Sequence, residues 1–238
     1  MELVVAPIAE LRATITRRFE ETVAATLHGD DSHLERPDCV TCGLTGGATA
    51  LIFLGALREA SLDWSRITFF WGDERAVPTD HADSNFGLAQ RLLLLPLGAD
   101  APAAKRMPAD EADLPAAARR YANQLPPALD LLILGVGEDG HICSLFPGHR
   151  ALTTDDERVT VVEDSPSPPP RRMTLTLPYV LASRRIWVVA VGPRKAGIVQ
   201  RAVARQSAST PLDLVTARGR DVTIFTDQEV RGASRSQN

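Results

Sequence analysis

The sequence predicts one α/β domain with a doubly wound, mostly parallel sheet flanked by helices. Short apolar runs typical of strands alternate along the chain with longer stretches of helical period. The run that begins at Leu131 is continuously apolar, which is typical of a parallel strand buried on both faces. A chain of 238 residues, 44% of them hydrophobic, is long enough for one large core, and no linker divides it.

The first half of the chain is expected to supply three strands and three helices. The first helix is predicted by apolar residues at helical spacing, namely Ile8, Leu11, Ile15, Phe19 and Val23. The third helix has Ser84 or Asn85 as its cap and stops at Pro96, because proline has no backbone N–H to continue a helix. The expected strands cover residues 2–6, 40–44 and 67–71, and the first two helices cover residues 8–27 and 49–60.

The second half continues the alternation of strands and helices. The proline-rich segment Ser165–Pro170 continues neither kind of element and is expected to be an extended loop. Helices are expected over residues 111–124 and 194–205, and strands over residues 129–135, 158–162, 172–177, 186–191 and 221–225. We expect the domain to cover residues 1–231 and the tail, residues 232–238, to be disordered.

Charge and cysteine content exclude several classes of protein. A net charge of −4 argues against a nucleic-acid partner bound through overall charge. Residues 1–7 carry an acid and no basic segment ahead of a long apolar stretch, so we expect neither a signal peptide nor a membrane span. Cys39 and Cys42 lie in a strand-like segment, Cys143 stands alone and the histidines are scattered, which argues against a zinc site. We therefore expect a soluble cytoplasmic protein without metal or membrane partner. No sequence feature reports the oligomeric state, for which a monomer is the working expectation.

The most informative segment is the apolar run from Leu131, which ends abruptly in Gly135-Val-Gly-Glu-Asp-Gly-His141. Open α/β sheets bind ligands at the carboxyl ends of their strands, so function is expected around His141. The glycines also match the dinucleotide fingerprint G-x-G-x-x-G. That fingerprint needs a helix to begin at the glycines, whereas Pro147 follows closely and two acids would repel a pyrophosphate. We expect the glycines instead to form a tight turn that presents His141.

This segment and three others, in the same order, resemble the 6-phosphogluconolactonase family. The matching segments are Leu134–Gly148, Leu44-Thr-Gly-Gly-Ala-Thr49, Phe69-Phe-Trp-Gly-Asp-Glu-Arg75 with Asp83-Ser-Asn85, and Pro168–Pro178 leading to Val191-Gly-Pro-Arg-Lys195. The resemblance implies a single Rossmann-like domain of the glucosamine-6-phosphate deaminase and ribose-5-phosphate isomerase type. It also implies hydrolysis of 6-phospho-D-glucono-1,5-lactone to 6-phosphogluconate, the second step of the oxidative pentose phosphate pathway, without a cofactor.

Lactone hydrolysis by water needs a base, stabilisation of the oxyanion and a proton for the departing ring oxygen. His141 suits both proton transfers, and either Glu138 or Asp139 is placed to orient it. Asp73 follows the third strand, where it would bond sugar hydroxyls, orient water or simply hold Arg75.

The phosphate of the implied substrate needs several donors. Gly46, Gly47 and Thr49 lie between a strand and a helix, where backbone amides and the helix dipole favour an anion. The family pattern Ser-Gly-Gly-Ser-Thr-Pro is altered here by Thr45, Ala48 and Ala50, so the backbone and Thr49 remain as donors. The candidate cations are Lys195, Arg75, and either Arg171 or Arg172, each Arg having a surface ion pair as its alternative.

The nearest alternative is a glucosamine-6-phosphate deaminase, which shares the Gly-x-Asp-Gly-His turn. That family typically continues with Phe-Asn-Glu-Pro, whereas Ser144–Gly148 contains no carboxylate, and it has Asp-Glu-Tyr where this chain has Asp73-Glu-Arg75. A sugar-phosphate sensor on the same fold is a further alternative. Only about forty residues precede Val40, and no basic helix-turn-helix stands among them.

Overall fold

The computed structural model describes residues 1–29, 38–204 and 209–230. Within these residues, seven parallel strands form one sheet in the order β1-β10-β9-β6-β2-β3-β5. The strands are Glu2–Val5 (β1), Val40–Leu44 (β2), Ile67–Trp71 (β3), Ala103–Lys105 (β5), Leu131–Gly135 (β6), Arg185–Ala190 (β9) and Val222–Thr226 (β10). The predicted parallel sheet is confirmed, and β5 is a short strand that the sequence pattern does not indicate.

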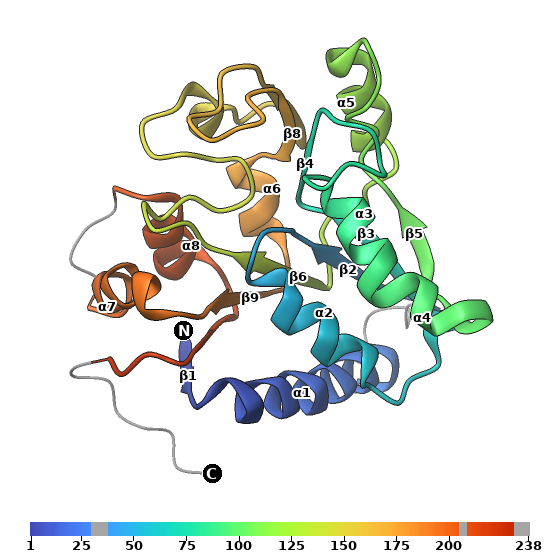
Figure 1. Ribbon diagram of the computed structural model, residues 1–238, viewed down its shortest axis with the longest axis vertical. Helices are drawn as coiled ribbons and strands as arrows, with labels where there is room; N and C mark the ends of the chain where they lie inside the picture. Colours follow the sequence, from blue (N-terminus) through green and yellow to red (C-terminus); the bar gives the residue numbers. More distant parts are fainter. Residues whose placement is uncertain (30–37, 205–208, 231–238) are drawn as a thin grey trace.

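Helices cover both faces of this sheet. Figure 1 shows α1 and α2 together on one side of β6 and β9, with α6 and α8 on the other. The helices are Ile8–His28 (α1), Ala50–Arg58 (α2), Asn85–Ala89 (α3), Leu95–Leu97 (α4), Leu114–Ala122 (α5), Leu177–Ala182 (α6), Ala196–Val203 (α7) and Pro211–Arg218 (α8). The arrangement is the predicted doubly wound α/β domain.

The core is centred on β6, as the apolar run predicts. Leu131, Leu132, Ile133 and Leu134 are all fully buried. Since neighbouring side chains on a strand point to opposite faces, both faces of β6 are covered. The first helix turns its predicted apolar side to this core with one exception: Ile8, in the first turn of α1, is 44% exposed, and Leu27 at the other end is buried instead.

A second, antiparallel sheet corrects part of the sequence prediction. Val159–Val162 (β7) and Arg172–Leu175 (β8) match the strands expected at 158–162 and 172–177, but they form a separate sheet with Asp73–Arg75 (β4), in which β8 pairs with both β4 and β7. β8 ends before residue 177 because Leu177 and Pro178 begin α6, where a proline in the first turn loses no hydrogen bond.

The helix expected to stop at Pro96 also differs from the prediction. Ser84 is its N-cap, since the Ser84 hydroxyl accepts a hydrogen bond from the backbone N–H of Gly87. The helix then passes through a π-helical turn over residues 90–94 into α4, and it ends at Gly98 with φ 61°. Pro96 directly follows the π-helical turn, in which the N–H of Leu95 donates to the carbonyl of Gln90 five residues back, and the helix continues past the proline to Leu97. The tail expected to be disordered, residues 232–238, lies outside the described residues.

The strand order creates one crevice at the centre of the sheet. β6 pairs with β2 on one side and with β9 on the other. The chain leaves β2 toward β3 but leaves β6 toward β9, so the connections run in opposite directions from this point. In open α/β sheets, ligands bind at the carboxyl ends of the strands where the connections diverge. The loops after β2 and β6 are therefore the expected walls of a site.

Candidate active site

A cavity of about 450 Å³ lies at this crevice. Segments that follow four parallel strands line it: residues 45–49 after β2, Asp73 and Arg75 after β3, residues 135–137 with His141 and Cys143 after β6, and residues 191–195 after β9. Most of the segments that carry the sequence motifs, which are far apart along the chain, therefore meet in one place.

The turn after β6 presents His141 to the cavity. The N–H of Gly137 donates to the carbonyl of His141 at 2.8 Å and the N–H of Gly140 donates to the carbonyl of Gly137 at 3.1 Å, which closes a tight turn. Gly140 has φ 87°, a conformation that favours glycine. The first helical segment after this turn is a 3₁₀ turn at Arg150–Thr153, so the helix that a dinucleotide site requires does not follow the glycines.

Asp139, not Glu138, is the carboxylate that orients His141. Asp139 Oδ1 lies 2.6 Å from His141 Nδ1 and accepts the His141 backbone N–H at 3.1 Å. Partial burial would raise the pKa of Asp139, but these bonds to His141 outweigh it and hold the pKa below its usual value. The imidazole packs on Phe146, with ring centroids 4.5 Å apart. Its Nε2 makes no hydrogen bond within the described chain, so that nitrogen is available to a ligand.

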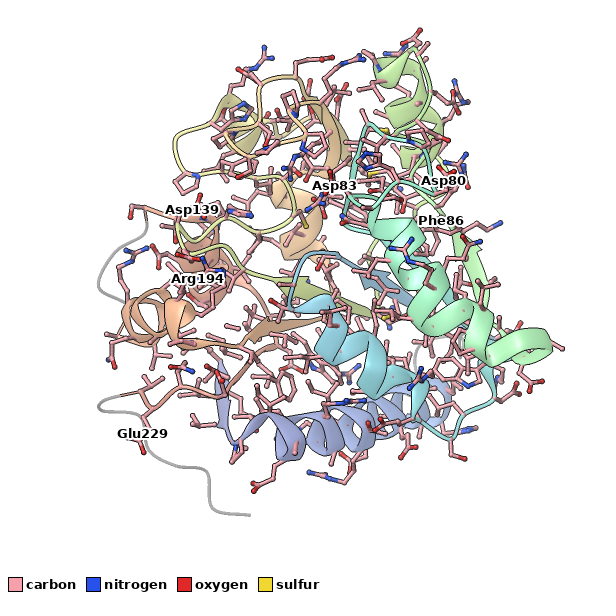
Figure 2. The ribbon with its side chains drawn as sticks, in the orientation of Figure 1. Asp80, Asp83, Phe86, Asp139, Arg194 and Glu229 are labelled. Atoms are coloured by element: carbon pink, nitrogen blue, oxygen red, sulfur yellow. The ribbon has the colours of Figure 1, made fainter. Side chains whose placement is uncertain are left out.

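Glu138 forms an ion pair with Arg194, which was not among the residues predicted for the site. Glu138 Oε1 lies 3.1 Å from Arg194 Nε, and Figure 2 shows Arg194 just before α7, on the same side of the molecule as Asp139. Arg194 lines the cavity although its side chain is 82% exposed. Its position directly before Lys195, at the end of the same loop, is the signal that would have identified it.

Lys195 and Arg75 bring further positive charge to the cavity wall. Burial lowers the pKa of Lys195, and Arg194 lowers it further, while Glu138 and Asp139 act in the opposite direction. Arg75 donates from Nη1 to the carbonyl of Asp83 at 2.9 Å. Its Nε is buried without a hydrogen-bond partner, and no carboxylate pairs with it among the described residues. The surface ion pair that the sequence allowed for Arg75 is therefore not observed.

The turn after β2 exposes backbone donors beside these cations. Gly47 has φ 82°, and α2 begins at Ala50 with Thr49 as its N-cap residue. The N–H groups of residues 46–49 donate no hydrogen bond within the described part of the chain. Thr45 anchors the turn, because its hydroxyl donates to the Ile133 carbonyl at 3.1 Å and accepts the N–H of Gly135 at 3.0 Å. The turn is thus fixed to β6 while its N–H groups remain available for an anion.

Asp73 is almost fully buried at the cavity wall, 3% exposed, with both oxygens held from behind. Ser144 Oγ donates to Asp73 Oδ2 at 2.8 Å and Asn85 Nδ2 donates to Asp73 Oδ1 at 3.1 Å. Its neighbour Glu74 points to the start of α3 instead, where it accepts the backbone N–H groups of Asn85 and Phe86. Burial raises the pKa of Glu74 despite these bonds. Asp73 therefore does not hold Arg75, one of the roles the sequence left open.

Neither arginine after the proline loop lines the cavity. Arg171 is exposed and pairs with Glu163, its Nε lying 2.7 Å from Glu163 Oε2. Arg172 is 2% exposed, and its guanidinium donates to backbone carbonyls of residues 167–169 and to Ser144. The expectation that one of them contacts phosphate is therefore not supported by their placement. Arg171 points to solvent and Arg172 points inward, because successive residues of an extended segment face opposite sides.

Two further observations bear on the kind of site. Among residues 1–29, 38–204 and 209–230, no group of three His, Cys, Asp or Glu side chains is arranged to hold a metal ion. Cys39 contacts Thr68, and Cys42 and Cys143 are buried as free thiols. None of the helices in these residues has the length and apolar character that a membrane crossing requires.

Sequence comparisons agree with the resemblance in the motifs. A family model described as glucosamine-6-phosphate isomerases/6-phosphogluconolactonase matches residues 9–224. The 6-phosphogluconolactonase of Rattus norvegicus is 36% identical over 236 residues, which cover 92% of this chain and 88% of the rat protein. The 6-phosphogluconolactonase of Mycobacterium tuberculosis is 39% identical over 175 residues, covering 67% of this chain and 71% of that protein.

Solved structures show the same fold. The 6-phosphogluconolactonase of Thermotoga maritima superposes with a TM-score of 0.77 at 25% identity, covering 94% of this chain and 96% of that one. The enzyme of Trypanosoma brucei gives 0.78 at 26% identity, with 94% and 95% covered. A monomeric glucosamine-6-phosphate deaminase gives 0.77 at 21% identity, with 96% and 98% covered, so the fold is common to both activities. On the family match and the relatives more than 30% identical, this chain belongs to the 6-phosphogluconolactonase family, within the larger group of glucosamine-6-phosphate isomerases and 6-phosphogluconolactonases.

Proposed function

We propose that this protein hydrolyses 6-phospho-D-glucono-1,5-lactone to 6-phosphogluconate by His141-assisted attack of water on the lactone carbonyl. The observation that carries the proposal is the His141–Asp139 pair at the wall of a cavity that Arg75, Arg194 and Lys195 also line. A proton-transfer group and a cluster of cations are the two features that a phosphorylated lactone requires.

His141 performs the proton transfers in this mechanism. With Nδ1 facing Asp139, Nε2 takes a proton from the attacking water and later returns it to the ring oxygen as the carbonyl–oxygen bond breaks. The Asp139 carboxylate stabilises the imidazolium that forms between these steps and fixes the ring orientation. Asp73, held by Ser144 and Asn85, offers the cavity a fixed acceptor for the water or for a sugar hydroxyl.

The phosphate binds at the start of α2 in this proposal. The backbone N–H groups of residues 46–49 and the N-terminal end of the nine-residue helix favour an anion there. Arg75 and Lys195 supply the charge, and Thr49 supplies a hydroxyl that caps nothing in the helix. Because burial lowers the pKa of Lys195, a bound phosphate also stabilises the charged form of that side chain.

Deamination of glucosamine 6-phosphate is the alternative activity on this fold. The segment after His141 argues against it, since Phe146 packs on the imidazole and Ser144–Gly148 offers no carboxylate for ring opening. We also propose that this hydrolysis needs no metal ion.

The test is acid release from freshly generated lactone, measured above the spontaneous rate, beside ammonia release from glucosamine 6-phosphate. We expect acid release that EDTA does not reduce, and no ammonia. The variant His141→Ala should lose at least about a hundredfold in kcat, since general acid–base groups contribute about 10²–10⁴.

A matched control is His149→Ala. His149 also pairs with an aspartate, Asp164 at 2.9 Å, but lies outside the cavity. We expect it to keep wild-type turnover. Ammonia release without acid release would replace the lactonase proposal with the deaminase, and full turnover by His141→Ala would remove His141 from the mechanism.

A further inference from the structure

A buried polar network lies behind the cavity wall. Its members come from three parts of the chain: Asp73 on β4, Ser144 after β6, and Arg172 and Thr174 on β8. All four are at most 3% exposed. The register of the antiparallel pair places Asp73 opposite Thr174 and Arg75 opposite Arg172. The small second sheet therefore delivers a buried guanidinium to the back of the active site.

Arg172 donates in several directions at once. Its Nε donates to the Pro169 carbonyl at 2.9 Å, and its Nη2 donates to the carbonyls of Ser167 at 2.7 Å and Pro168 at 3.2 Å. Its Nη1 donates to Ser144 Oγ at 3.3 Å. No carboxylate contacts Arg172 directly in the described chain. A buried cation is costly unless a negative charge offsets it, and the carboxylate of Asp73 is one hydroxyl away.

The direction of the Ser144 hydroxyl follows from its neighbours. A guanidinium has donors only, so Ser144 must accept from Arg172 and has its single proton for Asp73 Oδ2. The chain of bonds therefore runs in one direction, from Arg172 through Ser144 to Asp73. This polarity aims the Ser144 proton at Asp73 Oδ2 and holds that carboxylate in place at the cavity wall.

A second branch runs from the same guanidinium to the histidine. Arg172 lies over the ring of Phe146, 5.6 Å from its centroid, and Phe146 packs on His141 at 4.5 Å. A guanidinium over an aromatic face is attractive and fixes the ring beneath it. Phe146 is 2% exposed and cannot turn away without opening the core.

We propose that Arg172 is a positioning residue for the hydrolysis, which fixes Asp73 through Ser144 and fixes the ring of His141 through Phe146. Arg172 touches no substrate in this proposal, which rests on the lactonase function proposed above. The role replaces the phosphate contact that the sequence suggested for this arginine.

Other charged groups around Asp73 define what the test must separate. Glu74 and Arg75 follow it on β4, Cys143 lies near it in the segment after β6, His141 lines the same cavity, and Asp83 lies before α3. Asp139 faces His141. Arg172→Met leaves all of these in place, so a changed pH profile reports the loss of the Arg172 charge.

The first measurement is the pH dependence of kcat/KM for Arg172→Met, Ser144→Ala and the control Arg171→Met. Arg172 interacts electrostatically with Asp73, and its loss removes positive charge from behind the cavity wall. The acid limb should therefore move to higher pH. At neutral pH, kcat/KM should fall about tenfold or more. Arg171→Met removes an adjacent, exposed arginine and should leave both quantities unchanged.

The conservative variant Arg172→Lys separates charge from geometry. A lysine keeps the cation but cannot donate to Ser144 and to the three carbonyls together. We expect its acid limb to stay close to that of the wild type while kcat falls. Ser144→Ala keeps every carbonyl contact of Arg172 and removes one oxygen, so it tests the relay even if Arg172→Met fails to fold. An unmoved acid limb in folded Ser144→Ala and Arg172→Met overturns the proposal.

A readout without turnover keeps this proposal separate from the lactonase proposal. The carboxyl ¹³C signal of Asp73, assigned with Asp73→Asn, should change its chemical shift in Ser144→Ala and Arg172→Met, because the bond from Ser144 is lost or loosened. If the wild type hydrolyses no lactone, the proposed function fails while this signal still tests the link from Arg172 to Asp73. Identical chemical shifts in the wild type and both variants would disprove the link even in an active lactonase.

Discussion

Gly137→Ala tests whether the His141–Asp139 pair is the centre of the reaction, because the added methyl group falls on that pair. A Cβ at residue 137 would lie 2.1 Å from His141 Nδ1 and 2.4 Å from Asp139 Oδ1. Van der Waals contact begins near 3.5 Å, so both atoms must retreat by about 1 Å or more. The contacts are with the ends of two side chains and not with backbone, so the pair moves and the fold survives.

The expected loss follows from the size of this displacement. A misplacement of about 1 Å at a catalytic group costs on the order of a hundredfold in rate. We therefore expect kcat for lactone hydrolysis to fall about a hundredfold in Gly137→Ala, measured as acid release above the spontaneous rate. The melting temperature, measured by circular dichroism, should change little, since Gly137 has no positive φ to protect.

The matched control is Gly197→Ala in α7. A Cβ at residue 197 meets nothing within 4 Å, and alanine favours a helix by about 1 kcal/mol over glycine. This variant should keep full activity and melt at the same or a slightly higher temperature. Gly137→Ala with kcat within threefold of the wild type would refute the reasoning, because the pair would then be displaced without consequence.

Three further predictions concern binding, pH and stability. Lys195→Ala should raise KM about tenfold or more with little change in kcat, because a charged contact to the phosphate is lost. The control Lys105→Ala, on exposed β5, should leave KM unchanged. Equal KM values for Lys195→Ala and the wild type would exclude a phosphate contact. The pKa of Asp139 is lowered in the folded state, so its stabilising effect is present above the unfolded value near 3.9 and disappears as pH falls below it. The difference in melting temperature between wild type and Asp139→Asn should therefore shrink from pH 6 to pH 3, and a constant difference would contradict this. Ile133→Ala should lower the free energy of unfolding in urea by about 2–5 kcal/mol, since Ile133 is fully buried, and a loss below 1 kcal/mol would show that the core refills the space.

The sequence predicted the long elements well because their signals are local. The apolar run of β6 and the helical spacing of apolar residues in α1 directly predict which residues of these elements are buried. Three-residue strands such as β4 and β5 have no period to detect, and they form because neighbouring strands supply their hydrogen bonds. The second sheet could not be predicted for the same reason, because β8 pairs there with β4, which has only three residues.

Residue types and strand ends also indicated much of the candidate site. His141, Asp73, Arg75 and Lys195 each follow a strand of one parallel sheet, so their side chains reach the same edge. Arg194 was missed although it precedes Lys195 directly.

By itself, the sequence determined the α/β class, the family and the set of loops that form the cavity, because these depend on patterns within continuous segments. Only the tertiary structure decided between Glu138 and Asp139 as the partner of His141, and between Arg171 and Arg172 as the buried arginine. Each choice is between adjacent residues of like charge, so composition and spacing cannot separate them. The turn geometry after β6 and the register of β8 against β4 determine which side chain points inward.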